Sequence, residues 1–206
     1  MRDILKYTLL PLFLFQACSD EIKKEKFDID WIYSDEGRMV GASYNTAWIN
    51  DNTMYLMDMR KPKEERTLLK MNPSLSMKMV PVVDSEKISK SILSAVGRTD
   101  TSMYIEWPSS FSSTGNHGIY FFEEDIYMLD VPNESYRRVT NTKSEEKAAR
   151  FSPDGKKISF VRENDIYIYD IRTQKEKRIT FSGSETNLNG TVSWVYWEEI
   201  FGRKDL

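Results

Sequence analysis

The chain has 206 residues, of which 40% are apolar and 30% charged, and its net charge is −3. This balance is typical of a soluble globular domain, and the interspersed acids and bases exclude the basic surface that nucleic-acid binding requires. Cys18 is the only cysteine and His117 the only histidine. An internal disulfide and a zinc site built from cysteine and histidine are therefore excluded, and we predict no metal ligand and no cofactor.

The first eighteen residues indicate an export signal. Arg2 and Lys6 precede an apolar run over residues 7–15, which is too short to span a bilayer but has the length of a signal-peptide core. The run ends at Ala17-Cys18, an arrangement that resembles a bacterial lipoprotein signal. We expect residues 1–17 to be a signal peptide and residues 18–30 a tether whose lipidated Cys18 anchors the protein to a membrane of the bacterial cell envelope, facing the periplasm or the surface. The alternative is an ordinary secretory signal with an incidental cysteine.

Two elements are predicted in the first half of the remaining chain. Trp48-Ile49, a turn at residues 50–52 and a strand over Met54 to Asp58 indicate a hairpin. Residues 85–96 then favour a short helix, because Ile88, Ile92 and Ala95 fall on one face at helical spacing. The hairpin would belong to a first, weaker structural repeat, and the helix to an insertion that follows it.

A forty-residue repeat organises the second half of the chain. Asp125-Ile126-Tyr127 recurs as Asp165-Ile166-Tyr167, and Arg138-Val139-Thr140 recurs at the same interval as Arg178-Ile179-Thr180. About forty residues make one four-stranded propeller blade. We therefore predict an all-β fold, an incomplete β-propeller of four-stranded antiparallel blades over residues 31–206, with its best-defined blades at about 104–183.

The patterns inside the repeat agree with this prediction. Residues 158–161 and 166–170 favour two strands that are joined by a turn at Glu163-Asn164. Residues 152–155, with the sequence Ser-Pro-Asp-Gly, indicate a tight turn before the first of these strands. A further strand is predicted over residues 176–180.

The stretch Trp194-Val195-Tyr196-Trp197-Glu198-Glu199 carries a more specific signal. It resembles the glutamate-bearing segment of the dipeptidyl-peptidase IV branch of the prolyl oligopeptidase family, and the resemblance extends from about residue 118 to residue 201. It implies that Glu198 and Glu199 bind the free amino terminus of a peptide substrate. Neighbouring side chains diverge on a strand but can converge on a helical turn, so we predict a short helical excursion over residues 194–201. The alternatives are a solvated surface pair and an internal ion pair with Arg203.

The sequence also departs from this family. Members carry an arginine before a His-Ser-like stretch, where it helps to hold the substrate carbonyl, but the comparable place here reads Asn116-His117-Gly118, and no matching motif surrounds Arg98. The family's hydrolase domain with its Ser, Asp and His would follow the propeller, and no G-x-S-x-G motif occurs in these residues.

We therefore predict no catalytic residue. We expect an N-terminal fragment of a dipeptidyl-peptidase IV-like serine peptidase that contributes substrate recognition and is not catalytic alone. Its expected partners are a peptide N-terminus in a full-length context and the membrane, through the lipid anchor. The rival hypothesis is a non-enzymatic envelope lipoprotein whose propeller blades bind another protein.

Overall fold

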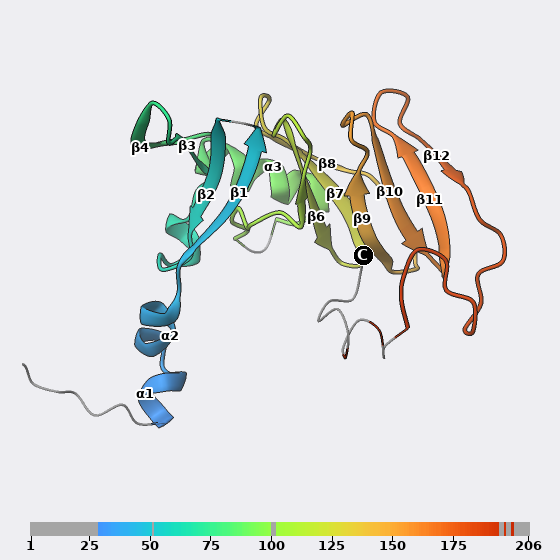
Figure 1. Cartoon of the computed structure of the whole chain (residues 1–206), viewed down its shortest axis with the longest axis horizontal. Coiled ribbons are helices and arrows are strands. Elements are labelled where there is room, and N and C mark those ends of the chain that lie inside the picture. The colour runs from blue at the N-terminus through green and yellow to red at the C-terminus, as the bar shows by residue number, and fades with distance from the viewer. Residues whose placement is uncertain (1–28, 51, 100–101, 194–195, 197–198, 200–206) are drawn as a thin grey trace, which may run out of the picture.

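Three four-stranded antiparallel sheets stand side by side in the structure (Figure 1). This computed structural model describes residues 29–50, 52–99, 102–193, 196 and 199. Each sheet is formed by four strands that follow one another in the chain, and each strand pairs with its sequence neighbours. This is the pattern of propeller blades, arranged here in an open row, so the prediction of an all-β, incomplete propeller is confirmed.

The first blade contains the predicted N-terminal hairpin. That hairpin consists of β1 (Tyr44–Asn50) and β2 (Thr53–Asp58), which pair with a shift of register between Trp48 and Asn50. A short 3-10 helix, η1 (Lys63–Glu65), leads to β3 (Leu69–Asn72) and β4 (Ser76–Pro81).

The second and third blades reproduce the forty-residue repeat strand by strand. The second blade consists of β5 (Ser110–Phe111), β6 (His117–Phe122), β7 (Asp125–Asp130) and β8 (Ser135–Arg138). The third consists of β9 (Glu146–Phe151), β10 (Lys157–Arg162), β11 (Asp165–Asp170) and β12 (Lys175–Arg178). Equivalent residues occupy equivalent positions in the two ladders, because Tyr120 faces Tyr127 and Phe160 faces Tyr167.

The central hairpins of these two blades have the same two-residue turn. Glu163 and Asn164 have φ values of 50° and 61°, and Glu123 and Glu124 have φ values of 49° and 71°. Two consecutive residues with positive φ match the twist of the flanking strands and close the hairpin tightly. The predicted turn at Glu163-Asn164 is confirmed, and the glutamates adopt a conformation that most side chains avoid.

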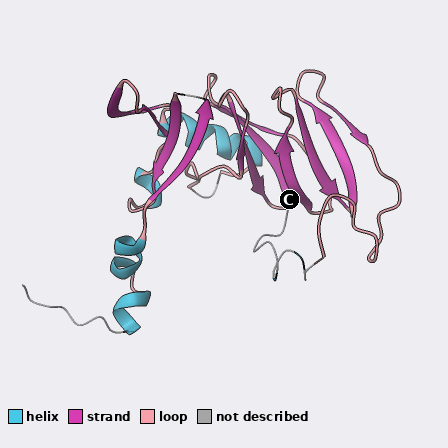
Figure 2. Ribbon diagram, in the orientation of Figure 1, coloured by secondary structure: helices cyan, strands magenta, loops and turns pink. Residues whose placement is uncertain are grey.

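The helices lie outside the sheets (Figure 2). α1 (Ile29–Tyr33) and α2 (Asp35–Gly41) extend away from the first blade, whereas α3 (Ser85–Val96) packs against β8. The predicted helix over residues 85–96 is therefore confirmed, and Ile88 and Ile92 are fully buried on its inner face. Within the described part of the chain, no helix is long and apolar enough to cross a membrane.

Two apolar clusters join the blades face to face. Met57 and Leu68 of the first blade, Leu129 of the second and Ile88 and Ile92 of α3 belong to one cluster. The other joins the second blade to the third and contains Ile119, Ile126, Met128, Ala149, Ile158, Phe160 and Tyr169. Burial of these side chains is the main source of stability that the sequence offers, since each propeller blade alone is too thin to enclose a core.

Candidate functional site

The repeated Asp-Ile-Tyr sequence places a buried carboxylate in each of the last two blades. Asp125 and Asp165 are 1% and 0% exposed. Each forms an ion pair with the arginine that ends its own blade, Arg138 and Arg178 respectively. The aspartate and the arginine of the repeat therefore recur together because they contact each other across β7 and β8, and across β11 and β12.

The repeated threonine completes this arrangement in the third blade. The Thr180 hydroxyl accepts a hydrogen bond from the backbone N–H of Ile166 (2.9 Å) and donates one to Asp165 Oδ1 (2.6 Å). The predicted strand over residues 176–180 ends at Arg178, because the chain turns there to bring Thr180 onto Asp165. Hydrogen bonds from Thr180, Arg178 and the Gly183 N–H lower the pKa of Asp165 to about 2. Asp165 is therefore ionised at neutral pH.

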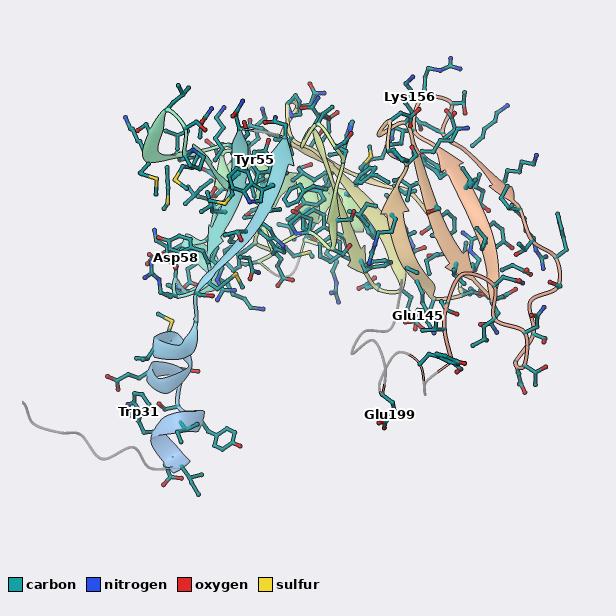
Figure 3. The ribbon with its side chains drawn as sticks, viewed as in Figure 1. Trp31, Tyr55, Asp58, Glu145, Lys156 and Glu199 are labelled. Atoms are coloured by element: carbon teal, nitrogen blue, oxygen red, sulfur yellow. The ribbon has the colours of Figure 1, made fainter. Side chains whose placement is uncertain are left out.

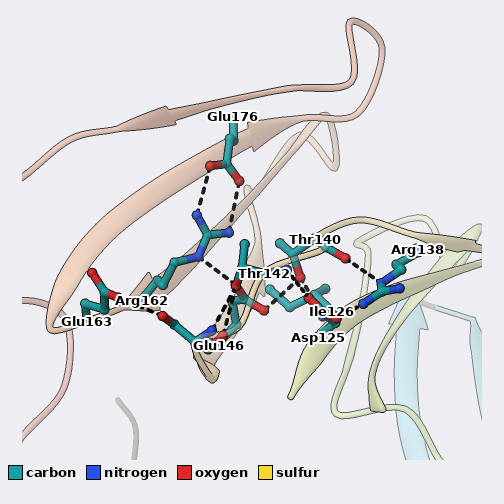
Figure 4. A network of polar contacts seen from close by, with 10 residues as sticks. Asp125, Ile126, Arg138, Thr140, Thr142, Glu146, Arg162, Glu163 and Glu176 are labelled. Carbon is teal, nitrogen blue, oxygen red and sulfur yellow. Dashed lines mark hydrogen bonds and ion pairs between the residues drawn. The ribbon is translucent and has the colours of Figure 1, made fainter. Parts of the chain in front are cut away.

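The second blade uses its threonine differently, and the difference links it to the third blade (Figure 4). The Thr140 hydroxyl donates to Glu146 Oε2 (2.8 Å) on β9, the first strand of the next blade. Glu146 Oε1 accepts hydrogen bonds from the Thr142 hydroxyl (2.8 Å) and from Arg162 Nε (2.7 Å). Arg162 in turn makes a two-point ion pair with Glu176, at 2.9 Å and 3.0 Å.

Glu146 and Arg162 are 2% and 8% exposed. Their contacts form a polar link between blades that the sequence analysis missed. The repeat does not predict it: Glu106 stands forty residues before Glu146, but Phe122 and Tyr136 occupy the positions that correspond to Arg162 and Glu176.

After the third blade the chain leaves the repeat and folds back over the β10–β11 turn. The backbone N–H of Asn189 donates to the carbonyl oxygen of Asn164 (3.0 Å), and the Asn189 side-chain amide donates to Asp165 Oδ1 (3.0 Å). The Asn164 side-chain amide donates to the carbonyl oxygen of Ser184 (3.0 Å). Gly190 has a φ of +82°, and a Cβ atom there would stand 2.7 Å from Val161 Cγ2, so this close approach requires glycine.

This returning segment, residues 182–192, forms one wall of an open cavity of about 920 Å³. The opposite walls are the β6–β7 turn, the beginning of β9 and the β10–β11 turn. Four glutamates and two cationic side chains line the cavity together with apolar and neutral polar groups: Ser109, Phe121, Glu123, Glu124, Glu145, Glu146, Lys147, Ala148, Arg150, Asn164, Leu188, Thr191 and Val192. A hollow of this size can hold a short peptide, and its glutamates favour a cationic group.

The predicted site residues are only partly placed. Cys18, Glu198 and Arg203 lie outside the described residues, as does most of the predicted excursion over residues 194–201. Glu199 is described and exposed. Figure 3 shows Glu199 and Glu145 at the same end of the molecule, opposite the end that carries Lys156. Glu199 therefore lies at the same end of the molecule as Glu145, a residue of the cavity wall.

Arg98 and His117 were considered for substrate binding or catalysis, and both make contacts within the fold. Arg98 forms an ion pair with Glu123 (3.2 Å), a residue of the cavity wall. His117 lies at the beginning of β6 with its ring 6.3 Å from that of Phe151, between the second and third blades. Burial lowers the pKa of His117. The negative charge of Asp130 opposes this lowering, and the positive charge of Arg137 adds to it. Among the described residues, no group of His, Cys, Asp and Glu is arranged to hold a metal ion.

Known proteins share parts of this sequence and fold. Residues 110–206 match the family model described as the dipeptidyl peptidase IV (DPP IV) N-terminal region. The crystal structure of Porphyromonas gingivalis dipeptidyl peptidase 4 superposes with a TM-score of 0.59 and 21% sequence identity, over 88% of this chain. The chain spans 26% of the length of that protein.

Weaker structural matches include TolB from Acinetobacter baumannii, with a TM-score of 0.42, 18% identity and coverage of 73% of this chain and 35% of that one. The tricorn protease gives a TM-score of 0.45 with 10% identity, over 68% of this chain and 13% of that one. No curated protein matches the chain. The matched family region contains the second and third blades, the returning segment and the Glu198-Glu199 pair. Residues 110–206 therefore match the dipeptidyl peptidase IV N-terminal region, the family that the sequence resembles.

Proposed function

We propose that this chain supplies the substrate-recognition part of a dipeptidyl-peptidase IV-like peptidase, in which Glu198 and Glu199 bind the free amino terminus of a peptide. The observation that carries the proposal is that the matched family region includes the Trp-Val-Tyr-Trp-Glu-Glu stretch. The position of Glu199 supports it, since this residue lies at the same end of the molecule as Glu145, which lines the cavity.

The chemistry of a peptide amino terminus fits this environment. An ammonium group has one positive charge and three N–H donors, which paired carboxylates can accept. Lys147, Arg150 and the Arg98 that pairs with Glu123 offset the charge of the glutamates in the cavity wall, and Glu198 and Glu199 would add two further negative charges. The cavity would therefore attract the ammonium end of a peptide and accommodate the residues that follow it.

A comparison of two peptides tests this function. Binding of a short Xaa-Pro peptide with a free amine to the 206-residue chain would be measured by calorimetry, beside its N-acetylated form. We expect the free amine to bind more tightly, and Glu198→Gln or Glu199→Gln to weaken its binding by about tenfold, because a hydrogen bond to a charged group is lost.

Glu185→Gln is the matched control, since Glu185 is an exposed glutamate of the returning segment outside the cavity wall. It should leave both affinities unchanged. Equal affinity for the two peptides would contradict the ammonium site and favour the rival function, a propeller-based lipoprotein that binds another protein.

We also propose that Cys18 carries lipid and anchors the chain to the cell envelope. The proposal is supported by the apolar run that ends directly before Cys18. A buried acyl chain contributes about 0.8 kcal/mol per CH₂, so more than one chain on the cysteine gives stable attachment. Mass spectrometry of the protein from membranes should find a lipid-modified N-terminal cysteine, and an intact Met1 terminus would contradict it.

A further inference from the structure

The two blades of the repeat continue differently once their last strand ends. After the second blade the chain enters β9 at Glu146, only six residues beyond Thr140. After the third blade the corresponding stretch, residues 182–192, forms no strand and returns to the β10–β11 turn instead. The regular propeller path is thus interrupted directly before the glutamate pair.

The hydrogen bonds of the interrupted stretch converge on one residue of the repeat. Asp165 Oδ1 accepts from the Gly183 N–H (3.1 Å) at the beginning of the stretch and from the Asn189 amide (3.0 Å) near its end. Asp125, its equivalent in the second blade, accepts only the first type of bond, from the Thr142 N–H (3.1 Å). The Asn189 contact is therefore an addition that belongs to the excursion and not to the blade.

We propose that Asn189 is a positioning residue: its amide fixes the returning segment to the buried Asp165 carboxylate and so sets where the chain leaves the third blade towards Glu198 and Glu199. The effect of Asn189 on peptide binding rests on the proposed function, whereas the anchoring of the segment to Asp165 does not. Asp165 is fully buried and paired with Arg178, which makes it a fixed acceptor. A hydrogen bond to an ionised acceptor is stronger than one between neutral groups.

The backbone around Asn189 holds the same arrangement. The Asn189 N–H donates to the Asn164 carbonyl, and Gly190 packs against Val161 and Ile166 of the third blade. Only eight residues lie between Asn189 and Glu198. If the anchor is released, the segment samples several positions, and the apparent affinity falls in proportion to the fraction of molecules with the competent one.

The experiment compares Asn189→Asp with the wild-type chain. The substitution keeps the size of the side chain but replaces the donor by a second carboxylate beside Asp165. Asn133→Asp is the matched control, because the Asn133 amide also donates to an aspartate, Asp130 (2.9 Å), on an exposed turn of the second blade. Hydrogen–deuterium exchange would report the anchoring, and calorimetry with the free-amine and N-acetylated Xaa-Pro peptides would report its consequence. Asn189→Ala removes the donor without adding charge and serves if the first variant folds poorly.

We expect faster exchange in residues 183–193 with unchanged exchange in the blade strands. We also expect binding of the free-amine peptide to weaken by about tenfold, with little change for the acetylated peptide, if the competent position is populated about one-tenth of the time. Unchanged exchange in both Asn189 variants would overturn the anchoring. A loosened segment with unchanged binding, or equal weakening for both peptides, would overturn the positioning role. If the wild-type chain does not prefer the free amine, the proposed function is wrong, and the exchange data alone then decide the anchoring.

Discussion

Buried carboxylates in this protein obtain their donors in two ways. Asp165 is held within its own blade and by the segment that follows it, whereas Glu146 receives donors from both sides of a blade interface. A buried acid without such partners would be strongly destabilising. The link between Glu146 and Arg162 therefore adds buried charged contacts beside the apolar cluster that joins the second and third blades.

Replacing Glu146 tests the contribution of this link to stability. We expect Glu146→Gln to lower the free energy of unfolding by about 1–3 kcal/mol, because charged hydrogen bonds to Arg162 and Thr142 are weakened in a buried site. The loss should be smaller than the 3–5 kcal/mol typical of an isolated buried pair, since Arg162 keeps its two contacts with Glu176. Denaturant unfolding would measure the difference.

The neighbouring residue offers a control for that experiment. Glu145 is 56% exposed and pairs with Lys147, which is 57% exposed. Exposed ion pairs contribute little, so Glu145→Gln should change the free energy of unfolding by less than about 0.5 kcal/mol. Similar losses of stability in both variants would mean that the buried Glu146 contacts contribute no more than the exposed ion pair of Glu145.

Individual elements were predictable where their spacing was regular. α3 follows from Ile88 and Ile92 at helical spacing, and its ends coincide with Asp84, which caps the first turn, and Gly97, which has a φ of 77°. The end of β12 was missed because it depends on a side-chain contact between Thr180 and Asp165, which spacing along one strand does not reveal. The returning segment lacks periodicity altogether, and its path is fixed by side-chain amides.

The inner face of α3 should be essential to the first apolar cluster. Ile92 is fully buried between the first two blades, and Ile92→Ala should lower the free energy of unfolding by about 2–5 kcal/mol through lost burial and a remaining cavity. Lys90 lies on the exposed face and pairs with Glu86, so Lys90→Ala should change the free energy of unfolding by less than about 0.5 kcal/mol. Thermal or denaturant unfolding distinguishes these expectations, and a mild Ile92 variant would show that α3 only covers the blade.

At the scale of the whole molecule, the repeat predicted the blades that share its register. The second and third blades match because Asp125 and Asp165, with their arginine partners, perform the same structural task. The first blade has Thr53 at the corresponding place and lies out of register with the others, so only its hairpin was evident. The inter-blade link through Glu146 remained hidden because its partner Arg162 has no equivalent in the second blade, where Phe122 occupies that position.

The edge strands at the two ends of the row of blades differ in the side chains that they expose. β12 forms one edge, and its four residues are all exposed and charged. β4 forms the outer edge of the first blade and exposes Met77 (70%) and Met79 (37%). Charged side chains discourage pairing of one edge strand with another, whereas an apolar edge favours it. Self-association of the 206-residue chain should therefore proceed through β4.

Sedimentation velocity over a range of concentrations would measure this association. We expect Met77→Lys to weaken it severalfold, since each copy then places a charge in the paired edge, while Lys177→Met on β12 should strengthen contacts at the opposite end. The open row should also melt over a broad range, because missing neighbours remove interface stabilisation from a repeat array. A monodisperse monomer with one sharp, cooperative transition would contradict both expectations, and it would mean that the three blades form a self-sufficient unit without closing a ring.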